Sequence, residues 1–350
     1  MRRVNGIASA RGKPAAVPGG AGAPLSQRVF ELLADQRFHS GTQLAAACGV
    51  SRSAIWKAVA ALRALGVSVH AVPHRGYRLP LATRPLEAGR IRNALPAYIG
   101  RHLRHGATLW STTSTNAVLL AQNDLAPGRF DFLTAEHQTA GRGRRTRGWI
   151  APPGGAICLS LSWSFASLPP AIGALSLAMG VCALRALARC GVSGAVLKWP
   201  NDLMVGEGKL GGILAELRAE TGGPAFVVIG IGLNVALGAT VLERVEATGT
   251  KAADLGALGA VPSDRNRIVA ALIAAVVEGL AQFEREGFSA FAQEWRAADA
   301  LLGRAVRVSA DAGSVAGHAR GIDLDGALCV QTSEGLQRFV TGDVSVRALA

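Results

Sequence analysis

The sequence predicts an α+β protein with an N-terminal winged helix-turn-helix, a central domain built on a mixed sheet, and a small C-terminal β-barrel. Near the N-terminus, helical spacing gives way to two short alternating segments around a turn. In the middle, strand-like segments outnumber helical ones and follow one another through short hairpins, which favours an α+β arrangement. The last stretch, of about 50 residues, alternates short strands with turns, as small barrels do. We place the parts at 1–24, 25–82, 83–300 and 301–350.

Composition and charge indicate a globular chain with an anionic partner near its N-terminal half. Hydrophobic residues make up 49% and charged residues 17% of the 350 residues, which is a globular mixture. Residues 1–150 carry 21 Lys+Arg against 6 Asp+Glu, whereas residues 151–350 carry 16 against 18. A coding bias towards arginine explains the 32 arginines against 5 lysines, but it does not explain their placement. The basic half therefore predicts an anionic partner.

Cysteine usage and apolar segments predict a cytoplasmic protein. The five cysteines are odd in number and scattered, without the paired spacing of a zinc site, so free thiols in a reducing compartment fit best. The N-terminus lacks the continuous apolar region of a secretory signal. The longest apolar stretch, Ala171–Leu184, falls short of the roughly 18 residues of a membrane span and predicts a buried helix. Residues 1–24, rich in Gly, Ala and Pro with four basic residues and no acidic one, predict a disordered tail.

The first folded part predicts a winged helix-turn-helix. Its expected elements are a helix from Leu25, a short helix capped by Ser40, a turn at Cys48–Val50, a third helix from Ser51 to about Leu65, and wing strands Val67–Val72 and Gly76–Leu79. On the third helix Ile55, Val59 and Leu62 face inward, which leaves a polar and basic outer face. This face and the wing tip are predicted to contact DNA: Ser51, Arg52, Ser53, Trp56, Lys57 and Arg75. A small helical packing module without DNA contacts is the alternative.

The central and C-terminal parts predict the following elements. Helices are expected at Leu86–Leu95, Asn116–Gln122, Ala171–Cys190 and Arg267–Glu286. Central strands are expected at Thr108–Trp110, Phe132–His137, Ala156–Trp163, Val196–Trp199, Leu203–Val205, Gly212–Leu217 and Phe226–Asn234. Barrel strands are expected at Ala305–Ser309, His318–Ile322, Ala327–Val330 and Arg338–Thr341.

The segment Gly141–Trp149 is the most informative stretch of the chain. It places four arginines and three glycines within nine residues and closes with a tryptophan. Glycines leave the backbone conformation open, while guanidinium groups match phosphate and carboxylate oxygens bidentately. The segment therefore predicts a loop that is mobile when empty and closes over an anionic ligand. A solvated basic loop or a nucleic-acid patch are the alternatives.

A second cluster of polar residues begins at Lys198–Asp202 and ends at Lys209. Two of the five lysines lie here although the chain otherwise prefers arginine, which indicates that a compact ammonium is needed. Pro200 ends a strand and places Asn201 and Asp202 on a turn, with Lys209 on the returning strand. The alternative is a hairpin with an ordinary surface ion pair.

Three further segments add weaker signals. Ser114-Thr115-Asn116 stands at an expected helix start and offers hydroxyl and amide groups. Gln138 adds a neutral donor and acceptor, and Gly230–Asn234 ends a buried strand with close backbone approach. A cap or a turn explains each of them equally well. Gly206–Gly211 matches GxGxxG, but the strand-like residues after it are too few for the helix of a dinucleotide site, so we reject that function.

Taken in order, the winged helix, STN, EHQTAGRGRR, KWPND, KLGGIL, GIGLN and the small barrel resemble the bifunctional biotin–protein ligase and biotin-operon repressor family. The resemblance covers residues 25–350. It implies a class II synthetase-like central domain and an SH3-like C-terminal barrel. It also implies that ATP and Mg²⁺ activate biotin to biotinyl-5′-adenylate, and that biotin then passes to one lysine of a biotin carboxyl carrier protein. The adenylate-loaded homodimer would repress transcription by binding operator DNA.

The resemblance further implies roles for the residues in the matching motifs. Biotin would be bound by Ser114, Thr115, Asn116, Gln138, Arg142, Gly143, Arg144 and Lys209. The nucleotide would be bound by Arg145, Arg147, Trp149, Lys198, Asn201 and Asn234. The catalytic set is Lys209, Arg144 and Asp202: the cations would stabilise the charge that develops as a carboxylate attacks a phosphate, and Asp202 would accept a proton from the acceptor lysine. No metal ligand is assigned. Thr146 stands in the loop where a glycine is more usual.

Two other functions stay open at this point. A non-catalytic winged-helix regulator that binds a small carboxylic acid would keep the fold without the chemistry, although Lys209 and the arginine loop argue against it. A lipoate–protein ligase shares the central fold but normally lacks the winged helix. Ligand preference separates the last possibility from a biotin ligase.

Overall fold

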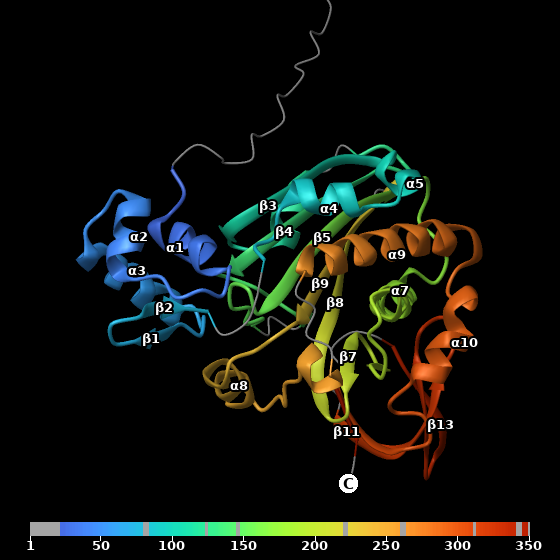
Figure 1. Ribbon diagram of the computed structural model, residues 1–350. Coiled ribbons are helices and arrows are strands. Elements are labelled where there is room, and N and C mark those ends of the chain that lie inside the picture. Colours follow the sequence, from blue (N-terminus) through green and yellow to red (C-terminus); the bar gives the residue numbers. More distant parts are fainter. Residues whose placement is uncertain are drawn as a thin grey trace, which may run out of the picture.

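A computed structural model describes residues 22–79, 84–122, 125–144, 148–219, 223–259, 264–310, 313–340 and 345–348. The chain forms three parts in sequence order (Figure 1). A small helical part with a hairpin precedes a seven-stranded sheet covered by helices, and a five-stranded antiparallel sheet follows. Most of the predicted tail, residues 1–21, lies outside the described residues.

The N-terminal part has the predicted helix-turn-helix and wing. Its elements are α1 (Leu25–Leu33), α2 (Gly41–Cys48), α3 (Arg52–Ala64), β1 (His70–Val72) and β2 (Gly76–Arg78). Ser40 caps α2 in a capping box with Gln43, and Ser51 accepts a hydrogen bond from Ala54 N at the start of α3. The α2–α3 turn is made by Gly49, whose φ of 65° lies in the left-handed region. These local signals are why the helices begin and end where the sequence predicted.

One wing strand is shorter than predicted. Residues 67–69 are not in a strand, because Val67 and Val69 point into the helical core and are buried there. Only His70–Val72 pairs with β2, in antiparallel register. His39 extends the wing by exchanging two backbone hydrogen bonds of 2.9 Å with Tyr77. The wing is thus a hairpin that is hydrogen-bonded to the segment between α1 and α2.

The central sheet is mixed, as predicted, because β3 and β4 run parallel while the other neighbours run antiparallel. Its spatial order is β3 (Leu103–Thr112), β4 (Phe130–Gln138), β5 (Ala156–Phe165), β9 (Ala225–Asn234), β8 (Gly208–Ala219), β7 (Asp202–Val205) and β6 (Val196–Lys198). The first strand begins five residues before the predicted one and continues beyond it through Ser111 and Thr112.

The helices around this sheet include several that the sequence did not predict. Those of the central domain are α4 (Ala88–Ala94), α5 (Ala97–Gly100), α6 (Thr115–Leu120), η2 (Ile172–Ala174), α7 (Leu175–Arg189), α8 (Ala239–Glu246), η3 (Leu255–Leu258), α9 (Arg265–Glu286) and α10 (Ser289–Ala298). Missing from the prediction were α5, α8, α10 and η3, whereas η2 occupies the start of the predicted helix Ala171–Cys190. The helix α10 carries Phe291 and Trp295, one turn apart and buried, so its spacing was a signal that we did not use.

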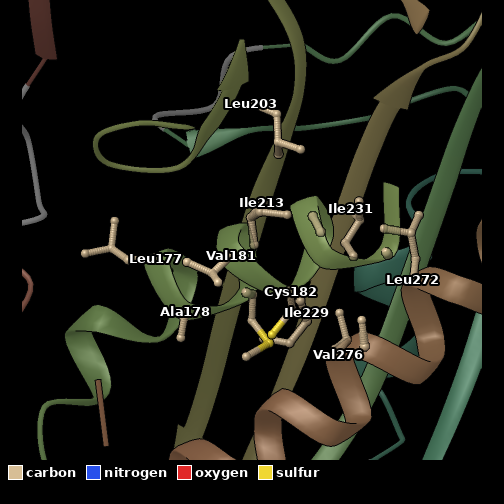
Figure 2. Close-up of a cluster of buried hydrophobic side chains, with 14 of the residues drawn as sticks. Leu177, Ala178, Val181, Cys182, Leu203, Ile213, Ile229, Ile231, Leu272 and Val276 are labelled. Carbon is tan, nitrogen blue, oxygen red and sulfur yellow. The ribbon is translucent and has the colours of Figure 1, made fainter. Parts of the chain in front are cut away.

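One face of the sheet carries the main core. Figure 2 shows α7 and α9 packing against β8 and β9, with Val181 near Ile213 and Val276 near Ile229. By length and composition two segments, Ile172–Arg189 and α9, would suit a membrane span, but 61% and 72% of them are buried inside the fold. Both are core helices, and for the first of them the apolar stretch 171–184 predicted this.

The opposite face is covered only in part. At one end α6 packs on Leu133, Phe226 and Val228 in a small second core. At the other end glycines and polar residues take the place of apolar side chains, and the candidate site lies there.

The C-terminal sheet is antiparallel, with the order β13 (Gly335–Phe339), β12 (Leu328–Thr332), β11 (Gly313–Ile322), β10 (Ala305–Ala310), β14 (Ser345–Ala348). The last strand was not predicted, and β11 is twice as long as the predicted His318–Ile322. The indole of Trp199 is buried and donates to Gly326 O at 3.0 Å, which ties this sheet to the central domain. An SH3-like closure is consistent with these five strands.

A buried ion pair attaches the segment that follows the N-terminal part to the central domain. Glu136 and Arg265 are 2.7 Å apart and almost fully buried. Glu136 also accepts from Leu86 N (2.8 Å) and Gly154 N (3.0 Å), and Arg265 donates to the carbonyls of Arg84 (3.2 Å) and Ala156 (3.0 Å). The pair therefore fixes the segment at 84–87 to β4, β5 and α9.

Candidate active site

The Lys198–Asp202 hairpin brings its predicted polar residues together. Lys198 lies opposite Asp202 in the β6–β7 pair, across a cis Trp199–Pro200 bond. The Asp202 carboxylate lies 2.5 Å from Lys209 Nζ, and both side chains are about one quarter exposed. The ion pair that the alternative interpretation of this hairpin expected is present, but it stands at the edge of the partly covered sheet face rather than on an open surface.

Asn201 is placed differently from what its predicted nucleotide contact suggests. The side-chain amide of Asn201 donates to Ile213 O (2.8 Å), and the backbone carbonyl of Asn201 accepts from Ile213 N (2.9 Å). Asn201 therefore locks the hairpin turn onto β8. This bracing holds the strand that carries Lys209 in a fixed relation to Asp202.

Glycines on three aligned positions form the floor of the site. Asp202 pairs with Gly212, Gly212 with Gly232, and Gly230 with Leu214 and Ser160. Directly paired residues share a sheet face, so Gly212, Gly230 and Gly232 all open onto the same side. The Lys209 ammonium lies over Gly212, 3.4 Å from where a Cβ would stand.

Two side chains lie against this floor and require glycine beneath them. An added Cβ at Gly230 would be 2.4 Å from Asn116 Oδ1, and one at Gly232 would be 2.5 Å from the Trp149 ring. The close backbone approach predicted for Gly230–Asn234 is therefore present. Because these positions lack a Cβ atom, side chains of the protein can lie against the sheet here, and a ligand can approach the sheet surface.

Four of the residues that the resemblance assigns to biotin binding form one hydrogen-bonded group. Ser114 caps α6, with a 3.5 Å contact from Ala117 N to its hydroxyl. Thr115 N donates to Gln138 Oε1 at 2.8 Å, which links the helix start to the end of β4. Ser160, on β5, lies 2.5 Å from Asn116 Oδ1 and 2.7 Å from Thr115 Oγ1. The Asn116 amide donates to Glu216 at 2.8 Å.

The arginine loop joins this group through its first arginine. Arg142 lies 2.9 Å from Glu216 and pairs with Gly148 in an isolated bridge, while Trp149 N donates to Gly141 O at 2.8 Å. Gly143 and Arg144 follow, and Arg144 lines a cavity of about 320 Å³ with Ser176 and Glu216 beside β8. Two predicted nucleotide ligands, Arg145 and Arg147, lie outside the described residues, as does Thr146.

Asn234 closes the other end of the site. Its amide donates to Lys209 O (3.2 Å) and Ala253 O (2.9 Å). Residues 251–253 run beside Lys209 and exchange backbone hydrogen bonds with it. Asn234 thus anchors the backbone around Lys209, and any nucleotide contact would use the remaining oxygen of its amide.

Burial keeps the floor beneath the tryptophan uncharged. Cys158 pairs with Gly232 on the same face and packs against Trp149. Burial raises the pKa of the Cys158 thiol to about 12, so it is a neutral part of the floor. Within the described ranges no three His, Cys, Asp or Glu side chains gather as a metal site.

Sequence reasoning missed two residues of this site, Ser160 and Glu216. Ser160 belongs to an otherwise apolar strand with serines at alternate positions, 160, 162 and 164. Such alternation indicates that one face of a strand meets polar groups. Glu216 ends the apolar run Ile213–Ala215, and its role depends on strand pairing that the sequence does not reveal.

The DNA-binding residues predicted on the N-terminal part are arranged on one helix and the wing. Arg52, Trp56 and Lys57 are exposed on α3, and Trp56 is 63% exposed. Ser51 and Ser53 share a 2.9 Å hydrogen bond at the helix start. On the wing, the Arg75 guanidinium lies 4.3 Å from the centre of the Phe38 ring. The predicted set therefore stands on one exposed helix face and an adjacent wing tip.

Comparison with known families agrees with the fold. The sequence matches an HTH domain over residues 25–78, the Biotin/lipoate A/B protein ligase family over 108–234, and a Biotin protein ligase C terminal domain over 301–347. The structure resembles that of the biotin protein ligase from Aquifex aeolicus in complex with biotin and ATP. The TM-score is 0.59 at 26% identity, over 70% of this chain and 100% of that one. The class is thus that of the protein ligases for biotin and lipoate.

Closer relatives narrow the class. The chain is 36% identical over 321 residues to the bifunctional ligase/repressor BirA of Salmonella typhimurium, covering 91% of this chain and 97% of the relative. It is 30% identical over 330 residues to BirA of Bacillus subtilis, covering 92% and 98%. It is 38% identical over 269 residues to the biotin–[acetyl-CoA-carboxylase] ligase of Mycobacterium tuberculosis, covering 74% and 95%. The chain belongs to the family of bifunctional biotin–protein ligases and repressors.

Proposed function

We propose that the protein activates biotin with ATP to biotinyl-5′-adenylate and transfers biotin to a lysine of a biotin carboxyl carrier protein. The observation that carries this is the Lys209 ammonium, held by Asp202 over a glycine floor whose other end presents Thr115 and Gln138. A carboxylic acid with a polar ring fits between a cation at one end and paired hydrogen-bonding groups at the other.

In the first step the biotin carboxylate attacks the α-phosphate of ATP and pyrophosphate leaves. Two anions must approach each other, so cations at the developing charge lower the barrier. Lys209 and Arg144 take this role, and one such preorganised contact contributes about 10²–10³ in rate. Mg²⁺ would accompany ATP and be held mainly by the substrate phosphates, and Asp202 is the carboxylate of the site that could add a ligand. When bound, the ion neutralises phosphate charge.

The nucleotide lies on the side of Trp149 and the Lys198–Asp202 hairpin. The Trp149 ring on Gly232 offers an apolar plane for adenine. We propose that Lys198 and Asn201 of the hairpin and Asn234 of β9, which lie around Lys209, contact the nucleotide. The same role is proposed for Arg145 and Arg147.

In the second step the acceptor lysine attacks the carbonyl of the adenylate and AMP leaves. The amine must lose a proton as the new amide forms, and Asp202 accepts it. An Asp202→Asn variant that transferred biotin unchanged across pH would exclude this role.

The same chain is proposed to repress biotin genes through its N-terminal part. Exposed Arg52, Trp56 and Lys57 on α3, with Ser51, Ser53 and the wing residue Arg75, would contact operator DNA. We propose that the adenylate-bound protein forms the homodimer that binds two half-sites. All five cysteines are free thiols, which supports a location in the cytoplasm. A gel shift on DNA upstream of biotin-synthesis genes, with and without biotin and ATP, tests the repressor function.

Biotin-dependent ATP–pyrophosphate exchange tests the ligase function. Exchange is expected with biotin and not with lipoate, and Lys209→Ala should abolish it. No exchange with either acid would favour a non-catalytic regulator, and exchange with lipoate alone would favour a lipoate ligase.

A further inference from the structure

The exposed face of α3 carries one large side chain without a charge, Trp56. This side chain is 63% exposed, whereas the other large apolar residues of α3 are buried in the helical core. Its neighbours one turn away along the helix, Ser53 and Ala60, are small and exposed. The indole therefore projects beyond the surface of the helix, where a partner can reach both its ring and its N–H group.

The other predicted DNA contacts on α3 differ from Trp56 in what they recognise. The Ser51 hydroxyl caps α3 and lies 2.9 Å from the Ser53 hydroxyl, so both serines are engaged at the helix start. Arg52 and Lys57 are cations that phosphates attract, and the phosphates are the same in every DNA sequence. A neutral ring gains nothing from phosphate charge, so Trp56 is suited to a base and not to the DNA backbone.

The chemistry of an indole selects one base. Its single polar atom, Nε1, only donates, and the rest of the side chain is a flat apolar surface. In the major groove guanine offers two acceptors, adenine an acceptor and a donor, and cytosine a donor. Thymine alone offers an acceptor, O4, beside an apolar group, the C5-methyl. A recognition helix meets base edges in this groove with its N-terminal residues, and Trp56 is the fifth residue of α3.

We propose that Trp56 is a specificity-determining residue of the DNA site: its indole packs against the C5-methyl group of a thymine in the major groove of each operator half-site. The proposal rests on the repressor function of the chain and adds the base that α3 recognises. The C5-methyl group takes no part in base pairing. The affinity for DNA should therefore depend on a group whose removal leaves the duplex intact.

Replacing every thymine of the DNA by uracil tests this dependence. The probe is a duplex from upstream of biotin-synthesis genes, bound in a gel shift with biotin and ATP. For the wild type we expect the uracil duplex to bind on the order of tenfold more weakly, because each buried methyl group contributes roughly fourfold and a dimer meets two of them. For Trp56→Ala we expect weaker binding to the thymine duplex and a Kd ratio between the two duplexes below about twofold.

Two further variants separate the methyl contact from other contributions. Lys57→Gln removes a neighbouring charge, so it should weaken both duplexes equally and reduce the slope of log Kd against log salt concentration by about 0.9. Trp56→Phe keeps an apolar ring, so it should keep most of the dependence on the methyl group. Lower salt brings weak variants into the measurable range, because phosphate contacts tighten there.

The outcomes distinguish the methyl contact from the repressor function. A wild type that binds both duplexes equally overturns the proposal, and so does a Trp56→Ala variant that keeps the wild-type ratio. Loss of the ratio in Lys57→Gln also overturns it, because the dependence would then not belong to Trp56. Absence of biotin-dependent binding of the wild type to the thymine duplex would instead overturn the repressor function.

Discussion

The buried pair of Glu136 and Arg265 offers the sharpest test of what holds the central domain together. Glu136→Ala would leave the guanidinium, whose side chain is 1% exposed, without its anionic partner. It would also leave the N–H groups of Leu86 and Gly154 without acceptors. Removing one partner of a buried pair costs about 3–5 kcal/mol. At roughly 2–4 °C per kcal/mol for a domain of this size, the melting temperature should fall by about 6–20 °C.

Equilibrium urea unfolding followed by tryptophan fluorescence measures this loss. The matched control is Glu294→Ala, which breaks an ion pair with Arg185 on the exposed side of α7 and α10 and should cost about 0–1 kcal/mol. The double variant Glu136→Met with Arg265→Leu removes both charges and should be less destabilised than Glu136→Ala. A loss no larger than that of the control, or a double variant as unstable as the single one, would refute the argument from burial.

Three further changes test single features. Gly232→Ala should force the Trp149 ring from the floor, since the new Cβ would lie 2.5 Å from it; the KM for ATP in exchange should rise about tenfold, and an unchanged KM would separate the ring from the nucleotide site. Burial raises the pKa of Cys158 to about 12, so a thiol reagent at neutral pH should modify it only after unfolding, and native labelling of this cysteine would contradict its burial. Burial also raises the pKa of Asp299 above its ordinary value of 3.8. The ionised form therefore weakens the fold at neutral pH, and Asp299→Asn should be more stable there, with an advantage that fades as the pH falls through the raised pKa; the Asn oxygen can still accept from Leu301 N. Unfolding curves at pH 7 and pH 4 measure this, and an equal effect at both would contradict it.

The sequence predicted the local features of this protein because they depend on neighbouring residues. Ser40 and Ser51 cap helices in place, and the apolar spacing of α3 and α9 predicted which face is buried. The Asp202–Lys209 pair was also predictable, since both residues belong to one hairpin. Signals of this kind act within a few residues, so a single sequence contains them.

Contacts between distant segments were not predictable in the same way. Glu216 meets Arg142 across 74 positions and Asn116 across 100, and nothing near Glu216 in the sequence marks it. Asn201 and Asn234 were predicted to bind the nucleotide. In the structure, however, their side-chain amide nitrogens donate to backbone carbonyls of β8. The contacts of such residues depend on which strands are neighbours in the sheet and on the register in which they pair.

The core on one face of the sheet sets the register that the site on the other face needs. Along β8 and β9, Ile213, Ile229 and Ile231 alternate with the floor glycines, and Figure 2 shows these isoleucines directed at α7 and α9. A shift of one residue would turn every side chain to the other face, placing isoleucines over the site and glycines in the core. Each buried isoleucine contributes about 1.5–3 kcal/mol relative to exposure, so three of them oppose the shift more strongly than any polar contact at the floor does. The apolar packing on one face therefore fixes the position of Lys209 over Gly212 on the other face.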